Sequence, residues 1–281
     1  MFGIFEDDKG KAGISWPAQE RTSDPVAKFF QDGSASTPSY PFKLSWHWNW
    51  TKHWKGDLVP ETSEDLEIDA EFLPMIWSPD NIDDGIEPQE GWRLLLGFNE
   101  PDHNNGDVAD PRSPQEAADA WVRLAELRTD PDNQHLVSPA VAGSVDWLHE
   151  FFSLIPEETK PEYLAVHVYT TSMDELISKL QWYYQEFNLP IILTEFCMTA
   201  SGYSSFDENV PNPEDQQQVH DFMGQATKWL DDCDFIVRYC WFGAVRDANN
   251  LHGIHPFNRL MDDDGEVTPL GWQYINGGHE D

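Results

Sequence analysis

Short apolar runs recur along this chain, and most are followed by a stretch with helical periodicity. The runs are rich in Leu, Ile, Val and aromatic residues, and polar, Gly or Pro positions separate them. This pattern is typical of buried strands. We expect strands at residues 11–16, 41–46, 71–77, 92–99, 135–139, 163–169, 190–195 and 235–241.

Helix signals lie between these runs. Ser113 with Glu116 three residues later forms a capping box, and Asn212-Pro213 begins another helix. Residues 51–70 are acidic and weakly periodic, so we expect a degenerate second helix there. Strand followed by helix eight times predicts an α/β fold, a single closed (β/α)8 TIM barrel forming one domain over residues 1–281. Helices are expected at 24–31, 82–90, 113–129, 145–155, 173–188, 213–232 and 269–276.

Length and charge narrow the possible functions. The 281 residues suit one barrel of about 250 residues, and no apolar run approaches the ~18 residues of a membrane span. The net charge of −34, from 51 acidic and 17 basic residues, disfavours nucleic acid, anionic lipid and anionic polysaccharide as partners. A neutral substrate fits better. The three cysteines are too few and too scattered for a disulfide framework or a zinc site.

Polar and aromatic residues gather where the expected strands end, whereas the strand interiors are aliphatic. In a parallel barrel these carboxyl ends meet at one mouth, which is where active sites are built. The sequence therefore predicts a functional site at that mouth. The residues at these ends are Trp16, Trp46, Trp77, Asn99, Glu100, Ser138, His167, Tyr169, Glu195 and Trp241.

Two glutamates, Glu100 and Glu195, follow or end buried strands. An ionised carboxylate is costly to desolvate, so such a position needs a functional reason or a solvated surface. Two carboxyl groups about 5 Å apart are what a retaining glycoside hydrolase requires, one as the acid and one as the nucleophile. The like charge of one raises the proton affinity of the other and keeps the acid protonated. The alternative for each alone is a surface carboxylate at a strand end.

Three further residues extend this hypothesis. Asn99 beside Glu100 is expected to hydrogen-bond a sugar hydroxyl. His167 and Tyr169 lie two positions apart and so share one face of their strand. In the mouth Tyr169 is expected to hydrogen-bond the nucleophile, and His167 to bind substrate or tune the acid. The alternative is a hydrogen-bonded His–Tyr pair in the core.

The tryptophans divide by their location. Indole faces stack on the apolar faces of pyranose rings, so we favour substrate contact for the strand-end residues Trp46, Trp77 and Trp241, with Trp16 as a further candidate. For Trp48, Trp50 and Trp54, in the loop after the expected second strand, substrate contact and loop packing stay open. The tryptophans at 121, 147, 182 and 229 are expected to pack within helices. Residues 102–107 lack calcium-loop spacing and indicate a turn, so no metal is expected.

The ordered motifs resemble glycoside hydrolase family 128 over residues 11–274. They are Leu95-Leu96-Gly97-Phe98-Asn99-Glu100-Pro101-Asp102, Val137-Ser138-Pro139-Ala140, His167-Val168-Tyr169 and Thr194-Glu195-Phe196. Gly13-Ile14-Ser15-Trp16 precedes them and Tyr239-Cys240-Trp241-Phe242 follows.

The resemblance implies a (β/α)8 barrel that cleaves β-1,3-glucan with retention and uses no metal or cofactor. By motif position, Glu100 would be the acid/base and Glu195 the nucleophile, with Asn99, His167, Tyr169 and the strand-end tryptophans binding sugar. It also implies a secreted protein whose leader is missing from this chain, with a cytosolic location as the alternative. We expect a monomer.

Three functions are compatible with the sequence. The leading hypothesis is a retaining endo-β-1,3-glucanase acting on laminarin- or curdlan-type glucan. The second is a barrel glycosidase for a β-1,4-linked mannan or glucan, because linkage preference depends on cleft shape. The third is a non-catalytic glucan-binding barrel, although both carboxylates are present here.

Overall fold

The computed structural model describes residues 10–17, 28–30, 44–53, 70–84, 91–106, 108–200 and 212–279. Three expectations fall mostly or wholly outside these residues, namely the first helix (24–31), the degenerate region (51–70) and Trp54. Within them the strands are β1 (Ala12–Ser15), β2 (Trp46–Trp48), β3 (Glu71–Phe72), β4 (Leu94–Leu96), β5 (His135–Val137), β6 (Leu164–Tyr169), β7 (Ile191–Cys197) and β8 (Ile236–Trp241).

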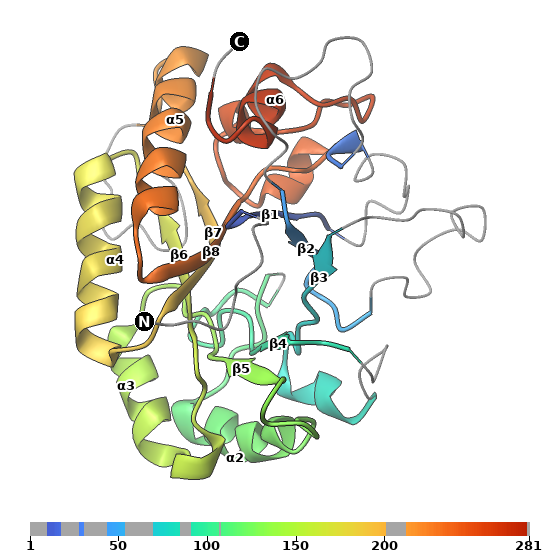
Figure 1. Cartoon of the computed structure of the whole chain (residues 1–281), viewed down its shortest axis with the longest axis vertical. Coiled ribbons are helices and arrows are strands. Elements are labelled where there is room, and N and C mark those ends of the chain that lie inside the picture. Colours follow the sequence, from blue (N-terminus) through green and yellow to red (C-terminus); the bar gives the residue numbers. More distant parts are fainter. Residues whose placement is uncertain are drawn as a thin grey trace.

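The named strands pair in parallel and follow chain order around the centre of the molecule (Figure 1). Six form one sheet in the order β3-β2-β1-β8-β7-β6, and β4 and β5 form another. Single parallel bridges, Met75 to Leu96 and Val137 to Tyr163, lie at the two seams between these sheets. The result is a barrel-like α/β fold, as the strand–helix alternation predicted.

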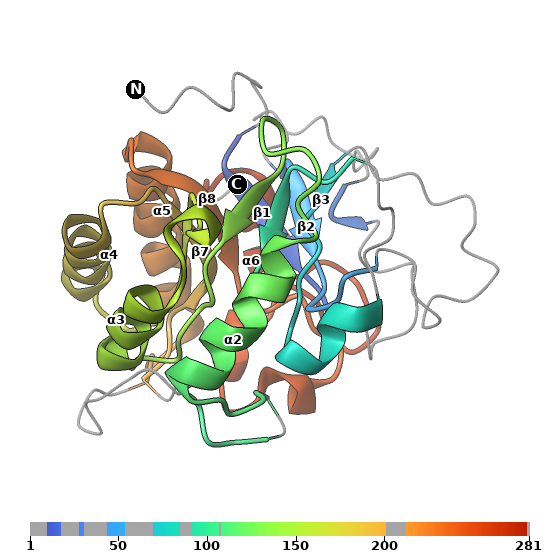
Figure 2. The ribbon, with the colours of Figure 1, turned by 90° about the horizontal axis from the view of Figure 1, so that it is seen from below.

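Helices α2–α5 lie outside the strands (Figures 1 and 2). The predicted capping box is present, since the Ser113 side chain accepts from the Glu116 N–H and Glu116 accepts from the Ser113 N–H. The α-helices are α2 (Pro114–Ala125), α3 (Val145–Leu154), α4 (Met173–Phe187), α5 (Gln216–Asp232) and α6 (Pro269–Ile275). Short 3-10 helices are η2 (Pro79–Asp84), η3 (Glu157–Thr159), η4 (Ala248–Leu251) and η5 (Pro256–Asn258). Among the described residues, no helix is both long and apolar enough to cross a bilayer.

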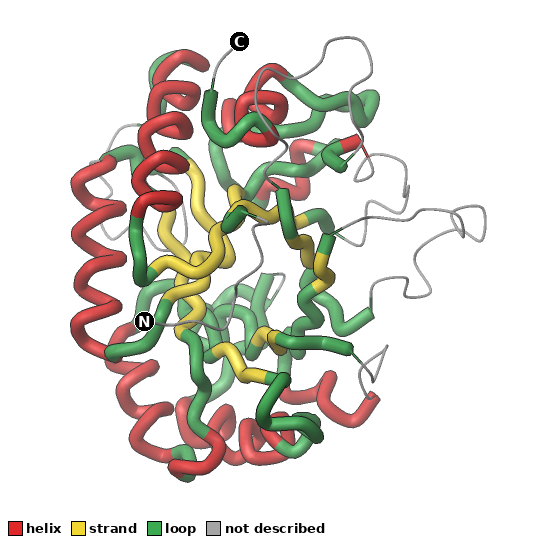
Figure 3. The backbone as a smooth tube through the Cα atoms, viewed as in Figure 1, coloured by secondary structure: helices red, strands yellow, loops and turns green. Residues whose placement is uncertain are grey.

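Buried side chains form two clusters on opposite faces of the strands. The larger packs the strands against the surrounding helices, whereas the smaller lies inside the ring of strands and includes Trp46, Trp48, Ala165, Ile192 and Cys240. Alternation along β4 and β8 sends neighbouring residues to different clusters. Figure 3 shows how short the strands are relative to the helices and loops. The three cysteines are all free.

The second strand lies later in the chain than predicted. Its pattern indicated residues 41–46, but β2 is Trp46–Trp48, so Trp46 begins the strand instead of ending it. Trp46 pairs with Gly13 of β1, where an added Cβ would come within 2.1 Å of the indole. The missing side chain of Gly13 therefore lets this large ring fill the interior at the amino end of the strands.

Candidate active site

A cavity of about 370 Å³ opens at the carboxyl ends of the strands. This volume is at the lower end of the ~300–1,000 Å³ typical of small-molecule sites. Its strand-end walls are Trp77, Asn99, Glu100, Tyr169, Glu195 and Phe242, and the segment 245–254 after β8 supplies a further wall. The mouth of the strands thus carries both glutamates that the sequence singled out.

Glu100 is held by its backbone in an unusual conformation. Its φ of +45° lies in the left-handed region, which is uncommon for a residue other than glycine and is often found at functional sites. The Glu100 N–H donates to the Ala140 carbonyl at 2.7 Å, and the Glu100 carbonyl accepts from His103 N–H at 2.9 Å. The whole residue is only 4% exposed. The loop conformation therefore points this carboxyl group into the mouth.

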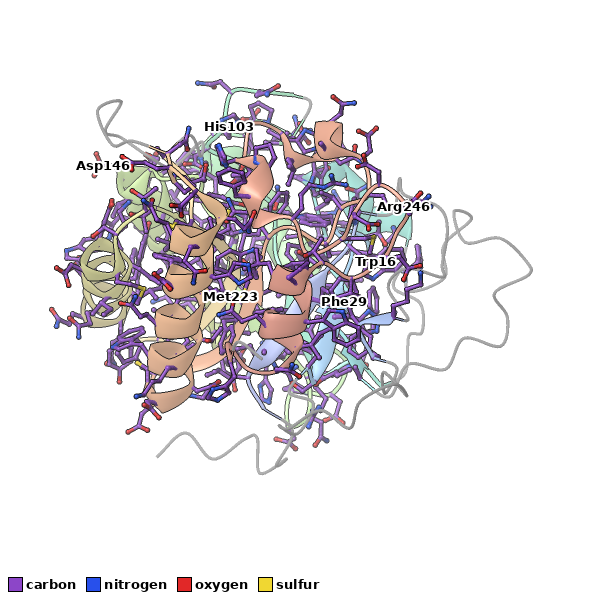
Figure 4. The ribbon with its side chains drawn as sticks, turned by 90° about the horizontal axis from the view of Figure 1, so that it is seen from above. Trp16, Phe29, His103, Asp146, Met223 and Arg246 are labelled. Carbon is purple, nitrogen blue, oxygen red and sulfur yellow. The ribbon has the colours of Figure 1, made fainter. Side chains whose placement is uncertain are left out.

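Asp102 ties that loop to the next one. Its carboxylate accepts backbone N–H groups from three consecutive residues, Ala142 at 2.7 Å, Gly143 at 3.1 Å and Ser144 at 2.8 Å. Ser144 is also the N-cap of α3. His103 and Asp146, labelled in Figure 4, line a surface hollow beside this connection. Asp102 thus anchors the Glu100 loop to the start of α3.

Glu195 reaches the mouth through an irregularity in β7. Ile192 pairs with Ala165 and faces the interior cluster, and regular alternation would turn the residue three positions later to the opposite face. The register shifts instead, so that Glu195 pairs with His167 and Thr194 is skipped. Bulges of this kind re-aim side chains next to active sites. The shift brings Glu195 to the same face as His167 and Tyr169.

Each oxygen of Glu195 has its own hydrogen-bond donor. The Tyr169 hydroxyl donates to Oε2, and the indole Nε1–H of Trp50 donates to Oε1 at 2.8 Å. Burial, together with the charge of Glu195, raises the pKa of Tyr169 well above its ordinary value, so the phenol keeps its proton. Only 6% of Glu195 is exposed.

His167 lies between the two glutamates. Its Nδ1 is 2.8 Å from Oε1 of Glu100 and 3.6 Å from Oε2 of Glu195. One ligand atom from each of these three residues lies within 4.8 Å of the others, and among the described residues this trio is the group able to hold a metal ion. The carboxylate oxygens concerned are also engaged by His167, Tyr169 and Trp50.

The shared environment raises the pKa values of Glu195 and His167. Burial is the main cause that raises the pKa of Glu195, and the charge of Glu100 adds to it, while His167 and the donors from Tyr169 and Trp50 oppose it. Burial alone would lower the pKa of His167, but the two carboxylates outweigh it and raise that pKa. The site therefore holds protons at a pH where isolated carboxyl groups would be ionised.

The structure brings most, but not all, of the predicted site residues together. Trp77, Asn99 and Tyr169 line the cavity with the two glutamates, and His167 lies directly behind Glu100. Asn99 donates from Nδ2 to the Val108 carbonyl at 3.2 Å, and its Oδ1 has no hydrogen-bond partner among the described residues.

Three of the tryptophans expected to contact substrate do not line the cavity. Trp46 and Trp241 have no exposed surface, Trp16 is 6% exposed, and none of them lines the cavity (Trp16 is labelled in Figure 4). Trp46 lies at the amino end of β2 because that strand is displaced along the chain. Trp241 ends β8, but its side chain turns outward against Phe196 and Phe222. An indole without exposed surface has no face to offer a sugar ring.

Sequence reasoning missed two parts of the site. The cavity residues of the segment 245–254, including Asn250, Leu251 and His252, follow β8 without a motif that would single them out. The sequence pattern indicates only a turn at Asp102, although its place two residues after Glu100 is a usable signal. The sequence leaves Trp50 open between substrate contact and packing, and its hydrogen bond to Glu195 gives it a third role.

The comparisons with known proteins agree with this geometry. A family model for the glycosyl hydrolase catalytic core matches residues 27–274. No curated protein matches the chain. The chain is similar to a solved subgroup V exo-β-1,3-glucanase of glycoside hydrolase family 128 from Cryptococcus neoformans, with 70% identity, a TM-score of 0.86, and coverage of 96% of this chain and 100% of that chain.

Two more distant solved structures are similar over nearly their whole length. A subgroup II endo-β-1,3-glucanase of the same family from Sorangium cellulosum is 25% identical, with a TM-score of 0.69 and coverage of 96% of this chain and 99% of that chain. A subgroup VII oligosaccharide-binding protein from Cryptococcus neoformans is 20% identical, with a TM-score of 0.70 and coverage of 96% and 94%; at this identity the likeness is one of fold alone.

Proposed function

We propose, from the premise that this chain belongs to the glycosyl hydrolase catalytic core family and within it to glycoside hydrolase family 128, that it hydrolyses β-1,3-glucan with retention. The observation that carries the proposal is the buried pair Glu100 and Glu195. One carboxylate oxygen of Glu100 and one of Glu195 lie within 4.8 Å of each other. Retaining enzymes place their carboxyl groups about 5–5.5 Å apart, whereas inverting enzymes need about 6.5–9.5 Å to admit a water molecule.

In the first step Glu195 attacks the anomeric carbon and Glu100 protonates the departing glycosidic oxygen. The hydrogen bond between His167 and Glu100 contains one proton. We assign this proton to Glu100 at the moment when the glycosidic bond breaks. In the second step water attacks the same carbon and gives a proton to Glu100, and Glu195 leaves as a carboxylate. The same residue thus serves as acid and then as base.

Neutral sugar fits the remaining groups of the cavity. Trp77 is half-buried and lines it, so one face is available for stacking on a pyranose ring. The unpartnered Oδ1 of Asn99 is available to accept a hydrogen bond from a sugar hydroxyl. We also infer that the strands close into a complete (β/α)8 barrel, an inference supported by the single bridges at its seams.

We propose cleavage from a chain end in place of the internal cleavage expected from the sequence. The 70% identical relative is an exo-β-1,3-glucanase. The compact cavity and its wall from the segment 245–254 also favour a short, bounded site over a long open groove. An endo-acting enzyme remains the competing outcome of the experiment below.

The test is a product time course on laminarin, curdlan and a β-1,3-oligosaccharide labelled at its reducing end, with β-1,4-mannan and cellulose in parallel. We expect hydrolysis of the β-1,3 substrates only, with products shortened stepwise from one end. Glu100→Gln and Glu195→Gln should each abolish turnover and still bind oligosaccharide, whereas the exposed control Glu158→Gln should behave as wild type. Binding without released sugar by the wild type would instead identify an oligosaccharide-binding protein.

A further inference from the structure

The backbone of Trp50 is strained at a position where nothing in the strand pattern requires it. Trp50 lies two residues after the end of β2 and has a φ of +58°, in the left-handed region that large side chains rarely adopt. The surrounding structure must over-determine such a conformation, and strain of this kind clusters at functional sites. The strain at Trp50 therefore indicates that the position of its side chain has a functional role.

The turn that imposes this conformation is braced by Asn49. Its Oδ1 accepts from the Thr51 N–H at 3.2 Å and from the Thr51 hydroxyl at 2.9 Å, and its Nδ2 donates to the His53 carbonyl at 3.2 Å. Asn49 is 3% exposed. These bonds fix the backbone on both sides of Trp50, so the direction in which its indole leaves the turn is set.

Aromatic neighbours then hold the indole ring. The ring of Trp48 lies 4.5 Å from that of Trp50, and the ring of Phe242 meets it edge-on at 5.8 Å. Phe242 also meets Tyr169 edge-on at 6.1 Å. One side chain thus packs against both groups that donate to Glu195, and the two donors are held in a fixed relation to each other.

The indole N–H suits this position because it can only donate. Unlike a hydroxyl, it has no lone pair to offer a protonated carboxyl group, so it favours the ionised form of Glu195. We propose that Trp50 is a positioning residue, whose N–H holds Oε1 of Glu195 in the orientation for attack. This role rests on the proposed retaining hydrolysis and differs from both sugar stacking and loop packing.

The Trp50 N–H contributes both when Glu195 attacks the sugar and when water releases the sugar from Glu195. When a Glu195 oxygen bonds to the anomeric carbon, the glycosidic bond breaks and its oxygen takes the proton of Glu100. When water later attacks that carbon, the ester bond breaks and its electron pair returns to the Glu195 carboxylate, where the charge reappears beside the Trp50 N–H. A fixed donor stabilises this charge without reorganisation at the moment of reaction.

The test compares Trp50→Phe with Trp50→His. Phenylalanine keeps an aromatic ring and removes the donor. Histidine removes the benzene part of the indole, but its Nε2 is joined to Cβ through the same number of bonds as the indole Nε1, and histidine tolerates the left-handed region better than most residues. Trp48→Phe is the matched control, since it disturbs the packing beneath Trp50 and leaves the Trp50 N–H in place.

We expect Trp50→Phe to lower kcat by about 10- to 100-fold, the effect of losing one hydrogen bond to a charged group, with KM changed by less than about threefold. The acidic limb of its kcat/KM profile should move to higher pH. Trp50→His should recover at least about tenfold in kcat over Trp50→Phe, and Trp48→Phe should leave the acidic limb unmoved. Near-ultraviolet circular dichroism verifies that each variant is folded.

The role of Trp50 would be overturned by equal kcat values for Trp50→Phe and Trp50→His. It would also be overturned if Trp50→Phe changed KM and left kcat at the wild-type value. These outcomes leave the proposed function standing, provided that the wild type hydrolyses β-1,3-oligosaccharide and Glu195→Gln does not. A wild type that binds but never cleaves would remove both proposals together.

Discussion

The Nδ1 atom of His167 lies 2.8 Å from Oε1 of Glu100, and both side chains are buried. This contact couples the protonation of an imidazole to that of the proposed acid. Because Glu195 is only 3.6 Å from the same Nδ1, a change at any of the three groups alters the other two.

Replacement of His167 should have a pH-dependent effect on stability. Burial alone would lower the pKa of His167, but the two carboxylates raise it above its ordinary 6.5. A raised folded-state pKa gives stability that is complete below 6.5 and is lost as pH rises through the folded value. Urea unfolding should therefore show the advantage of wild type over His167→Gln shrinking as pH rises above 6.5. An advantage that grows with pH would contradict the coupling.

Glu195→Gln should stabilise the protein at neutral pH although it abolishes activity. Burial and the charge of Glu100 raise the pKa of Glu195 above 4.5, so folding favours its protonated form and the ionised form is a cost at pH 7. The neutral amide removes that cost, and we expect a gain of about 0.5–2 kcal/mol in the free energy of unfolding. The gain should vanish as pH falls below 4.5. Chemical denaturation at pH 4 and pH 7 tests the sign.

Asp102→Asn should weaken the anchor of the Glu100 loop. The amide cannot accept all three N–H groups of Ala142, Gly143 and Ser144, so we expect a loss of about 1–3 kcal/mol in unfolding free energy and a lower kcat. The matched control is Asp215→Asn, where a carboxylate accepts one N–H, that of Gln218, at the start of α5. Equal kcat for the two variants would show that the anchor does not position Glu100.

Two tryptophan variants should separate core packing from substrate contact. Trp46 is fully buried and donates to the Lys11 carbonyl at 2.9 Å, so Trp46→Phe should cost about 1–3 kcal/mol in stability and leave KM unchanged. Trp77 lines the cavity, so Trp77→Ala should raise KM with little loss of stability. Thermal unfolding and steady-state kinetics on both variants measure the two effects. A raised KM in Trp46→Phe would instead support substrate contact by Trp46.

The strand–helix pattern predicted the parallel fold and the meeting of Glu100 with Glu195, because apolar runs ending in a carboxylate are local signals. It failed at β2, where bulky residues at 46 and 48 fill the interior and the apolar run does not indicate which end of the strand they occupy. It also failed at Trp241, which lies at a strand end but alternates outward.

The finer features of the site depend on three-dimensional packing. The register shift that turns Glu195 inward is a property of β7 against its neighbours, and nothing in Leu193-Thr194-Glu195 signals it. The bond from Trp50 to Glu195 joins residues 145 positions apart through a left-handed turn. The pattern of a single sequence contains neither relationship, whereas it does contain the residue types that take part.

The most direct measurement follows the anomeric configuration of the first product by proton NMR during hydrolysis of a β-1,3-oligosaccharide. Two carboxyl groups this close leave no room for a water molecule between nucleophile and sugar, so the newly released reducing end should appear first as the β-anomer and only later mutarotate. Initial release of the α-anomer would mean that water attacks directly, and Glu195 would then not be the nucleophile.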